Sequence, residues 1–224
     1  APEEDDDVLF TLNREITSYL ASHEQKTDPN SLYIVWIGAN NYLGVPEPEA
    51  IDSTVAEVTG GIEHGLKRLA SAGAKNILVM NLPDLGLTPA ARLFEAESTL
   101  TQCSERHNSR LKSMTEQLKE QYKQTQWVYF DINQVLSTVL KDPSKFGFTN
   151  IQDTCYDIQL SPKTGLPLLS IATQMMFSKP KSNQCQGYFY FDPVHPTQLV
   201  HHILTQFAIE FFDTVGYQFE SNIA

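Results

Sequence analysis

The chain has 224 residues, 41% hydrophobic and 10% aromatic, and is long enough to bury one substantial core. Its 27 acidic and 16 basic residues give a formal net charge of −11, which argues against binding to a nucleic-acid backbone. No apolar run in the sequence approaches the roughly 20 residues that span a bilayer. The acidic residues 1–7 show no signal-peptide pattern, and because the chain does not begin with Met we expect something to have been removed ahead of it.

In chain order, apolar periodicity predicts a helix over residues 8–20, a turn at 28–31, a strand over 32–37, a helix over 51–72, a strand over 77–80, a long helix over 89–122, a strand over 127–130, a helix over 133–140, a short strand over 188–191 and a helix over 197–212. The strands are unbroken apolar runs, a pattern typical of burial on both faces. Their alternation with helices indicates βαβ units and a parallel sheet, hence an α/β protein.

Residues 146–186 show no regular period, and a loop of this length inside a compact domain is usually functional. Its apolar residues fit a lid over an apolar substrate, or they complete the core. They are Leu166, Leu168, Leu169, Ile171 and the candidate substrate-binding residues Met175, Met176 and Phe177.

The chain has three cysteines, Cys103, Cys155 and Cys185, none in a Cys-x-x-Cys or Cys/His metal spacing, so we expect no zinc site. Cys155 and Cys185 flank a loop-like stretch and predict a disulfide, so we expect residues 146–187 to form a disulfide-bounded loop. Such a bond would place the protein in an oxidising compartment. The alternative is three reduced thiols in a cytosolic protein.

An aromatic run leads into Asp192-Pro193-Val194-His195. A carboxylate three residues before an imidazole can orient the ring, which can then act as a general base. Alone, this spacing arises often by chance, and a single His near a helix start is more often structural. No serine near a Gly-rich turn is present to serve as its nucleophile.

Two further motifs follow predicted strands. In Ile37-Gly38-Ala39-Asn40-Asn41, Gly38 permits close backbone approach and Asn40 offers a neutral amide donor suited to an oxyanion, although a plain polar turn is the alternative. In the stretch at residues 81–89, Asp84 is interpreted as a turn or capping residue. Pro89 suits a first helical position.

Taken in order, these motifs resemble the GDSL, or SGNH, lipase and esterase family. Residues 38–41 are similar to its G-x-N-D block, residues 192–197 to its D-x-x-H-P-T block, and residues 81–89 to the LPDLG-x-TP stretch of its bacterial members. The resemblance extends from about residue 8 to residue 212. It implies a three-layer α/β/α fold with a mostly parallel sheet, and chemistry that needs no metal or cofactor.

The resemblance implies Asn40 as an oxyanion donor, Asp192 as the acid that orients the ring and His195 as the general base. It places Gly38 and Asn41 beside the substrate. Other histidines, at positions 64, 107, 201 and 202, are expected at the surface or in packing.

Two features depart from the family pattern. Asn41 stands where the family has Asp, and the Gly-Asp-Ser-Leu block and the oxyanion Gly are missing from the sequence. Ser53 is rejected as the nucleophile because no Gly precedes Asp52 and the site lies on a predicted helix. Residues 1–224 therefore resemble the C-terminal part of a single domain whose first strands are missing. We expect a companion N-terminal segment that carries the Gly-Asp-Ser block.

The resemblance implies a serine-dependent acyl ester hydrolase that works through an acyl-enzyme, most like the family's secreted bacterial lysophospholipases and glycerophospholipid–cholesterol acyltransferases. The apolar loop favours a lipid ester substrate, lysophospholipid or phospholipid, with acyl transfer to a lipid alcohol as a second reaction and transient contact with a membrane surface. The alternatives are a short-chain or carbohydrate acetylesterase and a noncatalytic binding module. We expect a secreted or periplasmic bacterial protein, with Asn40 and His195 converging on one cleft.

Overall fold

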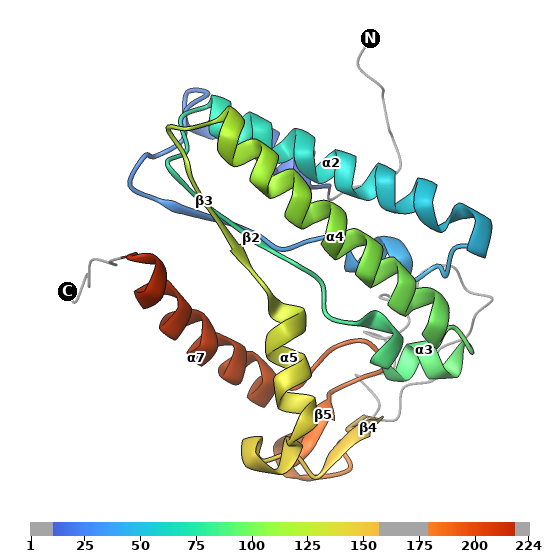
Figure 1. The fold of residues 1–224 in the computed structure, drawn as a ribbon. Coiled ribbons are helices and arrows are strands. Elements are labelled where there is room, and N and C mark those ends of the chain that lie inside the picture. Colours follow the sequence, from blue (N-terminus) through green and yellow to red (C-terminus); the bar gives the residue numbers. More distant parts are fainter. Residues whose placement is uncertain (1–10, 157–178, 218–224) are drawn as a thin grey trace. The chain divides into compact units, whose positions relative to one another are not determined.

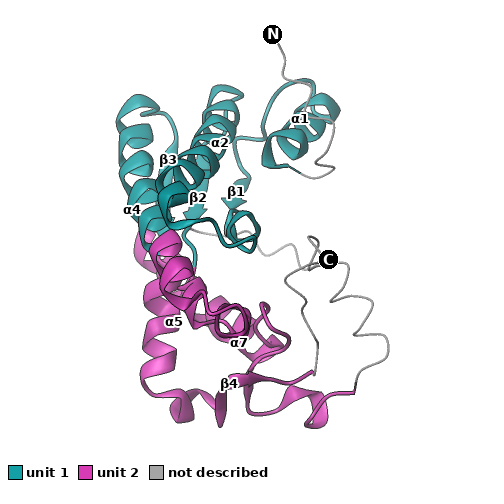
Figure 2. Ribbon diagram, turned by 90° about the vertical axis from the view of Figure 1, so that its right-hand side faces the viewer, with its two compact units in different colours: residues 1–82, 105–130 teal, residues 83–104, 131–224 magenta. Residues whose placement is uncertain are grey.

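The computed structural model describes residues 11–156 and 179–217, which divide into two compact units (Figure 2). Unit 1 holds residues 11–82 and 105–130, and unit 2 holds residues 83–104, 131–156 and 179–217 of the described chain. Each unit has its own parallel sheet.

Unit 1 is built on a three-stranded sheet in the order β1 (Leu32–Val35), β2 (Asn76–Met80) and β3 (Gln126–Phe130). Both strand pairs are parallel, with Val35 opposite Val79 and Val79 opposite Tyr129. The helices of this unit are α1 (Leu12–Ser22; Figure 2), and α2 (Ile51–Ser71) and the greater part of α4 (Glu97–Gln121), which Figure 1 labels. Two short 3₁₀ helices, η1 (Ala39–Tyr42) and η2 (Pro48–Ala50), also belong to it. The predicted α/β class with parallel strands is confirmed.

The core of unit 1 lies between one face of this sheet and the three helices. Its buried apolar residues on α2 and α4 recur at helical spacing, which is why the sequence pattern located these helices. They pack against alternate residues of the strands, and each buried large side chain contributes about 1.5–3 kcal/mol. The cluster consists of Ile16, Leu20, Val35, Ile62, Leu66, Leu69, Ala74, Ile77, Val79, Leu111, Met114, Leu118 and Trp127.

β1 differs from the prediction of a strand buried on both faces over residues 32–37. It ends at Val35, and while Val35 is buried, Ile34 is 56% exposed, Trp36 43% and Ile37 39%. Among the described strands, β1 pairs with β2 alone, and the apolar cluster covers only its Val35 face. The apolar run therefore predicted the strand correctly but overestimated its burial.

Unit 2 contains a two-stranded parallel sheet, β4 (Asn150–Thr154) with β5 (Tyr188–Tyr190). Its helices are α3 (Pro89–Leu93), the first part of α4, α5 (Ile132–Lys141) and α7 (Gln198–Val215), and its 3₁₀ helices are η3 (Leu85–Leu87), η4 (Pro143–Phe146) and η5 (Asn183–Cys185). β4 was not predicted, because its sequence shows neither an alternation of apolar and polar residues nor a continuous apolar run.

The single long helix predicted over residues 89–122 is wrong, because the structure breaks it into α3 and α4. Thr88 caps α3 by accepting a hydrogen bond from the Ala91 N–H at 3.1 Å, and Pro89 occupies its first turn as predicted. The chain then leaves the helix at Glu95, whose φ of +54° lies in the left-handed region. Leu93 and Leu100 are one heptad apart, so the apolar period continues across the break and conceals it.

None of the helices in the described ranges is both long and apolar enough to cross a membrane.

Candidate active site

Asp192 and His195 form a hydrogen-bonded pair in unit 2. The Nδ1 atom of His195 lies 2.7 Å from Oδ2 of Asp192. The carboxylate is buried, with 2% of the side chain exposed, whereas half of the imidazole side chain is exposed. Because Asp192 engages Nδ1, the ring presents Nε2 as the nitrogen that can exchange a proton with a substrate.

The second oxygen of Asp192 holds the backbone of the same turn. Its Oδ1 accepts hydrogen bonds from the N–H groups of Val194 and His195, both at 2.8 Å. The turn is closed by a bond of 2.9 Å from the Phe191 N–H to the His195 carbonyl. One carboxylate therefore orients the imidazole and fixes the backbone that carries it.

This turn connects β5 to α7, and hydrogen bonds to neighbouring elements hold it in place. The carbonyl of Pro193 accepts a hydrogen bond from the Ala90 N–H in α3 at 2.9 Å. Thr197, buried at the start of α7, donates its hydroxyl proton to the Tyr188 carbonyl at 2.9 Å. The His195 ring is thus mounted on backbone that is anchored on both sides.

The environment of His195 favours its protonated form. The hydrogen bond to the Asp192 carboxylate raises the pKa of His195, partial burial opposes this effect, and the charge of Asp192 adds to the rise. A raised pKa makes the imidazole a stronger base and stabilises the imidazolium that forms after it accepts a proton.

The Gly38–Asn41 motif forms a tight turn directly after β1 in unit 1. Gly38 has a φ of +119°, a conformation that favours glycine, and its carbonyl accepts the Asn41 N–H at 3.2 Å. Asn40 and Asn41 are exposed on η1, whereas Tyr42 at its end is fully buried. Asn40 is therefore exposed to solvent on a turn whose end is anchored by the buried Tyr42.

Side chains form hydrogen bonds along residues 81–89, the stretch that follows β2 and runs from unit 1 into unit 2. In unit 1, the Asn108 side chain accepts the Leu82 N–H at 2.9 Å and donates to the Leu82 carbonyl at 2.8 Å. In unit 2, Asp84 caps η3 by accepting the Gly86 N–H, and also accepts the Thr101 hydroxyl at 2.7 Å. The interpretation of Asp84 as a capping residue is confirmed.

The candidate residues fall in different parts of the molecule. Gly38, Asn40 and Asn41 belong to unit 1, and Asp192 and His195 belong to unit 2. Their convergence on one cleft stays a prediction. Met175, Met176 and Phe177 lie outside the described residues, as does most of the loop predicted to act as a lid.

The four histidines expected at the surface or in packing have those environments. His64, His201 and His202 are exposed, and His107 is fully buried. Sequence reasoning missed that His107 contacts the Gly38 turn, since the two segments are far apart along the chain and no local pattern links them. Ser53, rejected as a nucleophile, is an exposed residue of α2 whose hydroxyl donates to the Ala50 carbonyl at 2.9 Å.

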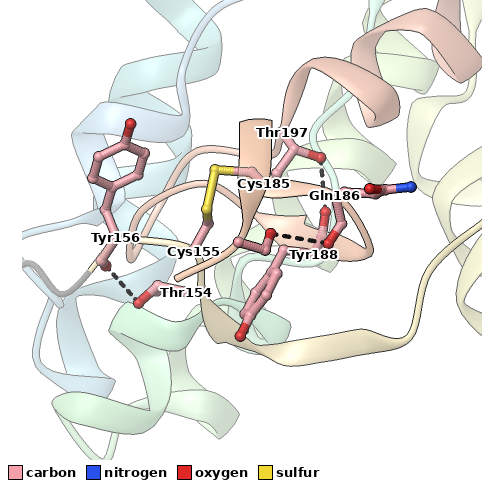
Figure 3. The surroundings of a disulfide bond; sticks show 8 residues. Thr154, Cys155, Tyr156, Cys185, Gln186, Tyr188 and Thr197 are labelled. Atoms are coloured by element: carbon pink, nitrogen blue, oxygen red, sulfur yellow. Dashed lines mark hydrogen bonds between the residues drawn. A yellow bond between two sulfur atoms is a disulfide. The ribbon is translucent and has the colours of Figure 1, made fainter. Parts of the chain in front are cut away.

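The predicted Cys155–Cys185 disulfide is confirmed (Figure 3). It lies beside the strand that leads to Asp192, because the Cys155 N–H donates to the Tyr190 carbonyl at 2.9 Å and the Tyr156 N–H to the Phe191 carbonyl at 3.0 Å. Cys103 is buried and lies outside this disulfide. Within residues 11–156 and 179–217, no three His, Cys, Asp or Glu side chains are grouped as metal ligands would be.

Comparison with known proteins places the chain in a family. The model of the GDSL-like lipase/acylhydrolase family matches residues 5–207. The phosphatidylcholine-sterol acyltransferase of Aeromonas hydrophila is 31% identical over an alignment that covers 92% of this chain and 68% of that protein. The secreted effector protein SseJ of Salmonella typhimurium is 30% identical over 88% of this chain and 42% of its own length.

The thermolabile hemolysin of Vibrio parahaemolyticus is 25% identical over 91% of this chain and 47% of that protein. The chain thus spans about two thirds of the acyltransferase and less than half of the other two relatives. The disulfide and the secreted relative are consistent with an extracellular location. The family model and these relatives cover nearly the whole chain, which therefore belongs to the GDSL-like lipase/acylhydrolase family.

Proposed function

We propose that this chain supplies the general base, the orienting carboxylate and an oxyanion donor of a serine-dependent lipid acyl hydrolase. The observation that carries the proposal is the contact of 2.7 Å between His195 Nδ1 and the buried Asp192 carboxylate, which leaves Nε2 for a hydroxyl. Family membership supports ester hydrolysis or acyl transfer in general.

In the proposed reaction, His195 Nε2 accepts the proton of a serine hydroxyl as the serine oxygen attacks the ester carbonyl carbon. The Asn40 NH₂ group donates to the oxyanion that forms, and a donor in that position typically contributes about 3–4 kcal/mol. The imidazolium then protonates the departing alkoxide, which leaves as an alcohol. Water attacks the acyl-enzyme with the same base assisting, or a lipid alcohol does so and completes an acyl transfer.

We propose that the serine arrives on a companion N-terminal segment that carries the Gly-Asp-Ser block and pairs with the outer edge of β1. That edge has no partner among the described strands. Ile34 on β1, and Trp36 and Ile37 directly after it, are exposed apolar residues. Parallel strands end at the same edge of a sheet. A strand beside β1 would therefore deliver the residues that follow it next to the Gly38–Asn40 turn.

We propose lysophospholipid or phospholipid as the substrate class and a secreted or periplasmic location. The A. hydrophila relative is named a phosphatidylcholine-sterol acyltransferase, and its similarity covers 92% of this chain. The sequence between Cys155 and Cys185 contains Met175, Met176 and Phe177, and these apolar residues support an acyl chain as the group bound. An enzyme of this kind would contact a membrane surface during turnover.

The test is a comparison of kcat/KM for acetyl and palmitoyl esters in a preparation that contains this chain and the Gly-Asp-Ser segment. We expect the palmitoyl ester to be preferred, with lysophospholipid hydrolysed and the serine labelled by a fluorophosphonate. Preference for acetyl esters would indicate the acetylesterase instead. Absence of both labelling and turnover would indicate a noncatalytic binding module.

The role of the loop has a separate test in the deletion of residues 166–177. If the loop covers the acyl chain, the deletion lowers kcat/KM for palmitoyl esters much more than for acetyl esters. An equal change for both substrates would exclude a lid.

A further inference from the structure

The imidazole of His107 contacts both ends of the turn that carries Asn40. Gly38 lies two residues before Asn40 and Tyr42 two residues after it, and both meet this ring, which comes from α4. All of these residues belong to unit 1.

At the first contact, Gly38 lies against the edge of the ring. A Cβ atom placed on Gly38 would be 2.8 Å from His107 Cε1 and 3.6 Å from Nδ1, closer at Cε1 than real side chains approach. The φ of +119° at Gly38 also disfavours any residue with a side chain. The turn and α4 can therefore approach this closely only with glycine at position 38.

At the second contact, a hydrogen bond of 2.9 Å joins the Tyr42 hydroxyl to His107 Nδ1. The two rings are nearly perpendicular, at 85°, with centroids 5.7 Å apart. Both side chains are fully buried, so the bond is shielded from water. It fixes the end of η1 to α4.

Packing alone does not explain a histidine at position 107. Its Nε2 atom is buried and has no hydrogen-bond partner among the residues that the structure describes, which is unfavourable. Burial also lowers the pKa of His107 to about 4, so the ring is neutral at neutral pH. An apolar side chain would avoid the unpaired Nε2 but would leave the Tyr42 hydroxyl without this partner.

We propose that His107 and Tyr42 are positioning residues that hold the Asn40 amide in place as the oxyanion donor. This inference rests on the proposed function, in which Asn40 donates to the tetrahedral intermediate. The Asn40 side chain is exposed, so its direction depends on the backbone of the turn, and the ring of His107 fixes that backbone on both sides. A small displacement of a donor from the oxyanion is costly in rate.

The test is Tyr42→Phe, which removes only the hydroxyl, assayed in the preparation that contains the Gly-Asp-Ser segment. We expect kcat to fall about 10- to 100-fold with KM unchanged, a smaller loss than the roughly 10²- to 10³-fold expected for removal of an oxyanion donor by Asn40→Ala. His107→Gln, which keeps a polar partner for Tyr42, should retain more activity than His107→Leu. The matched control is Tyr33→Phe in the same unit, which removes hydrogen bonds to Tyr19 and Asp28 and should leave kcat unchanged.

A double-mutant cycle separates positioning from a general structural effect. If Tyr42 acts through Asn40, Tyr42→Phe has little further effect on kcat in an Asn40→Ala background. Full additivity of the two substitutions, or an unchanged kcat in Tyr42→Phe, would overturn the proposal.

A second readout does not require activity. In this chain alone, NMR order parameters of residues 38–42 should decrease in Tyr42→Phe and stay unchanged in Tyr33→Phe. If the wild-type preparation hydrolyses no ester, the proposed function fails, and the order parameters still decide whether the ring holds the turn. Unchanged order parameters in Tyr42→Phe would show that the hydrogen bond between Tyr42 and His107 does not hold the turn.

Discussion

Replacing Asp192 with Asn separates the catalytic role of this carboxylate from its structural one. In the wild type, Oδ1 accepts two backbone N–H groups and Oδ2 faces His195 Nδ1. Asn keeps one oxygen, which can retain both backbone bonds, but it turns an NH₂ group toward Nδ1. Nδ1 must then accept, so Nε2 carries the proton and can no longer serve as a base.

The expected magnitudes differ for rate and for stability. Loss of the correct tautomer lowers kcat about 10⁴-fold, which corresponds to about 5.5 kcal/mol of activation free energy. The free energy of unfolding of Asp192→Asn at pH 8 should change by less than about 1 kcal/mol, because the backbone bonds survive. Asp192→Ala removes the acceptor altogether and should cost about 1–3 kcal/mol for each N–H kept from water.

The pH dependence has a definite sign. Because the Asp192 carboxylate raises the pKa of His195, the protonated pair stabilises the fold at low pH, and this contribution is lost as the pH rises through the pKa of the folded state. Asp192→Asn should therefore destabilise the protein more at pH 5 than at pH 8. It should also lower the pKa of His195, so the acid limb of any residual activity moves to lower pH.

The assays are an NMR titration of His195 in this chain, urea unfolding at the two pH values, and kcat in the active preparation. An unchanged or higher pKa of His195 in Asp192→Asn would show that the carboxylate does not raise that pKa, and retention of wild-type kcat would show that it does not set the tautomer. Equal destabilisation by Asn and Ala would show that the backbone bonds do not explain the stability effect.

Three further variants test the framework around the site by urea unfolding. Replacing Cys155 and Cys185 with Ser should lower the unfolding free energy by about 3–4 kcal/mol, because the bond joins residues 30 apart, and no loss would show that the closed loop adds no stability. Asn108→Ala removes both side-chain bonds to buried Leu82 and should cost about 2–4 kcal/mol, whereas a neutral effect would mean that water replaces them. Gly86→Ala places a Cβ against the Glu97 carbonyl oxygen and the Thr101 hydroxyl, so we expect a loss of at least about 1–3 kcal/mol, and wild-type stability would contradict the close packing.

The sequence predicted those features that depend on local patterns. The period of Ile62, Leu66 and Leu69 located α2, and the apolar run at Ile77 located β2, since each pattern reflects burial of one element against the core. The Asp192–His195 pair was predicted because it too depends on residues close together in the sequence. Three residues of separation, with prolines limiting the backbone between them, are enough to bring the groups together.

Features that depend on distant contacts were not predicted. β4 owes its strand conformation to pairing with β5, and its own residues carry no strand pattern. The break at Glu95 is hidden by an apolar period that continues across it. The contact between Tyr42 and His107 joins positions 65 apart, so only the folded structure could reveal it.

In the proposed function, one acyl-transfer site uses His195 and Asn40 together. The most direct measurement is an experimental structure of the preparation with its serine phosphonylated by a long-chain phosphonate. We predict a phosphonyl oxygen about 3 Å from the Asn40 side-chain nitrogen, with His195 Nε2 within hydrogen-bond distance of the serine oxygen. An adduct that touches neither Asn40 nor His195 would show that these two residues do not share an acyl-transfer site.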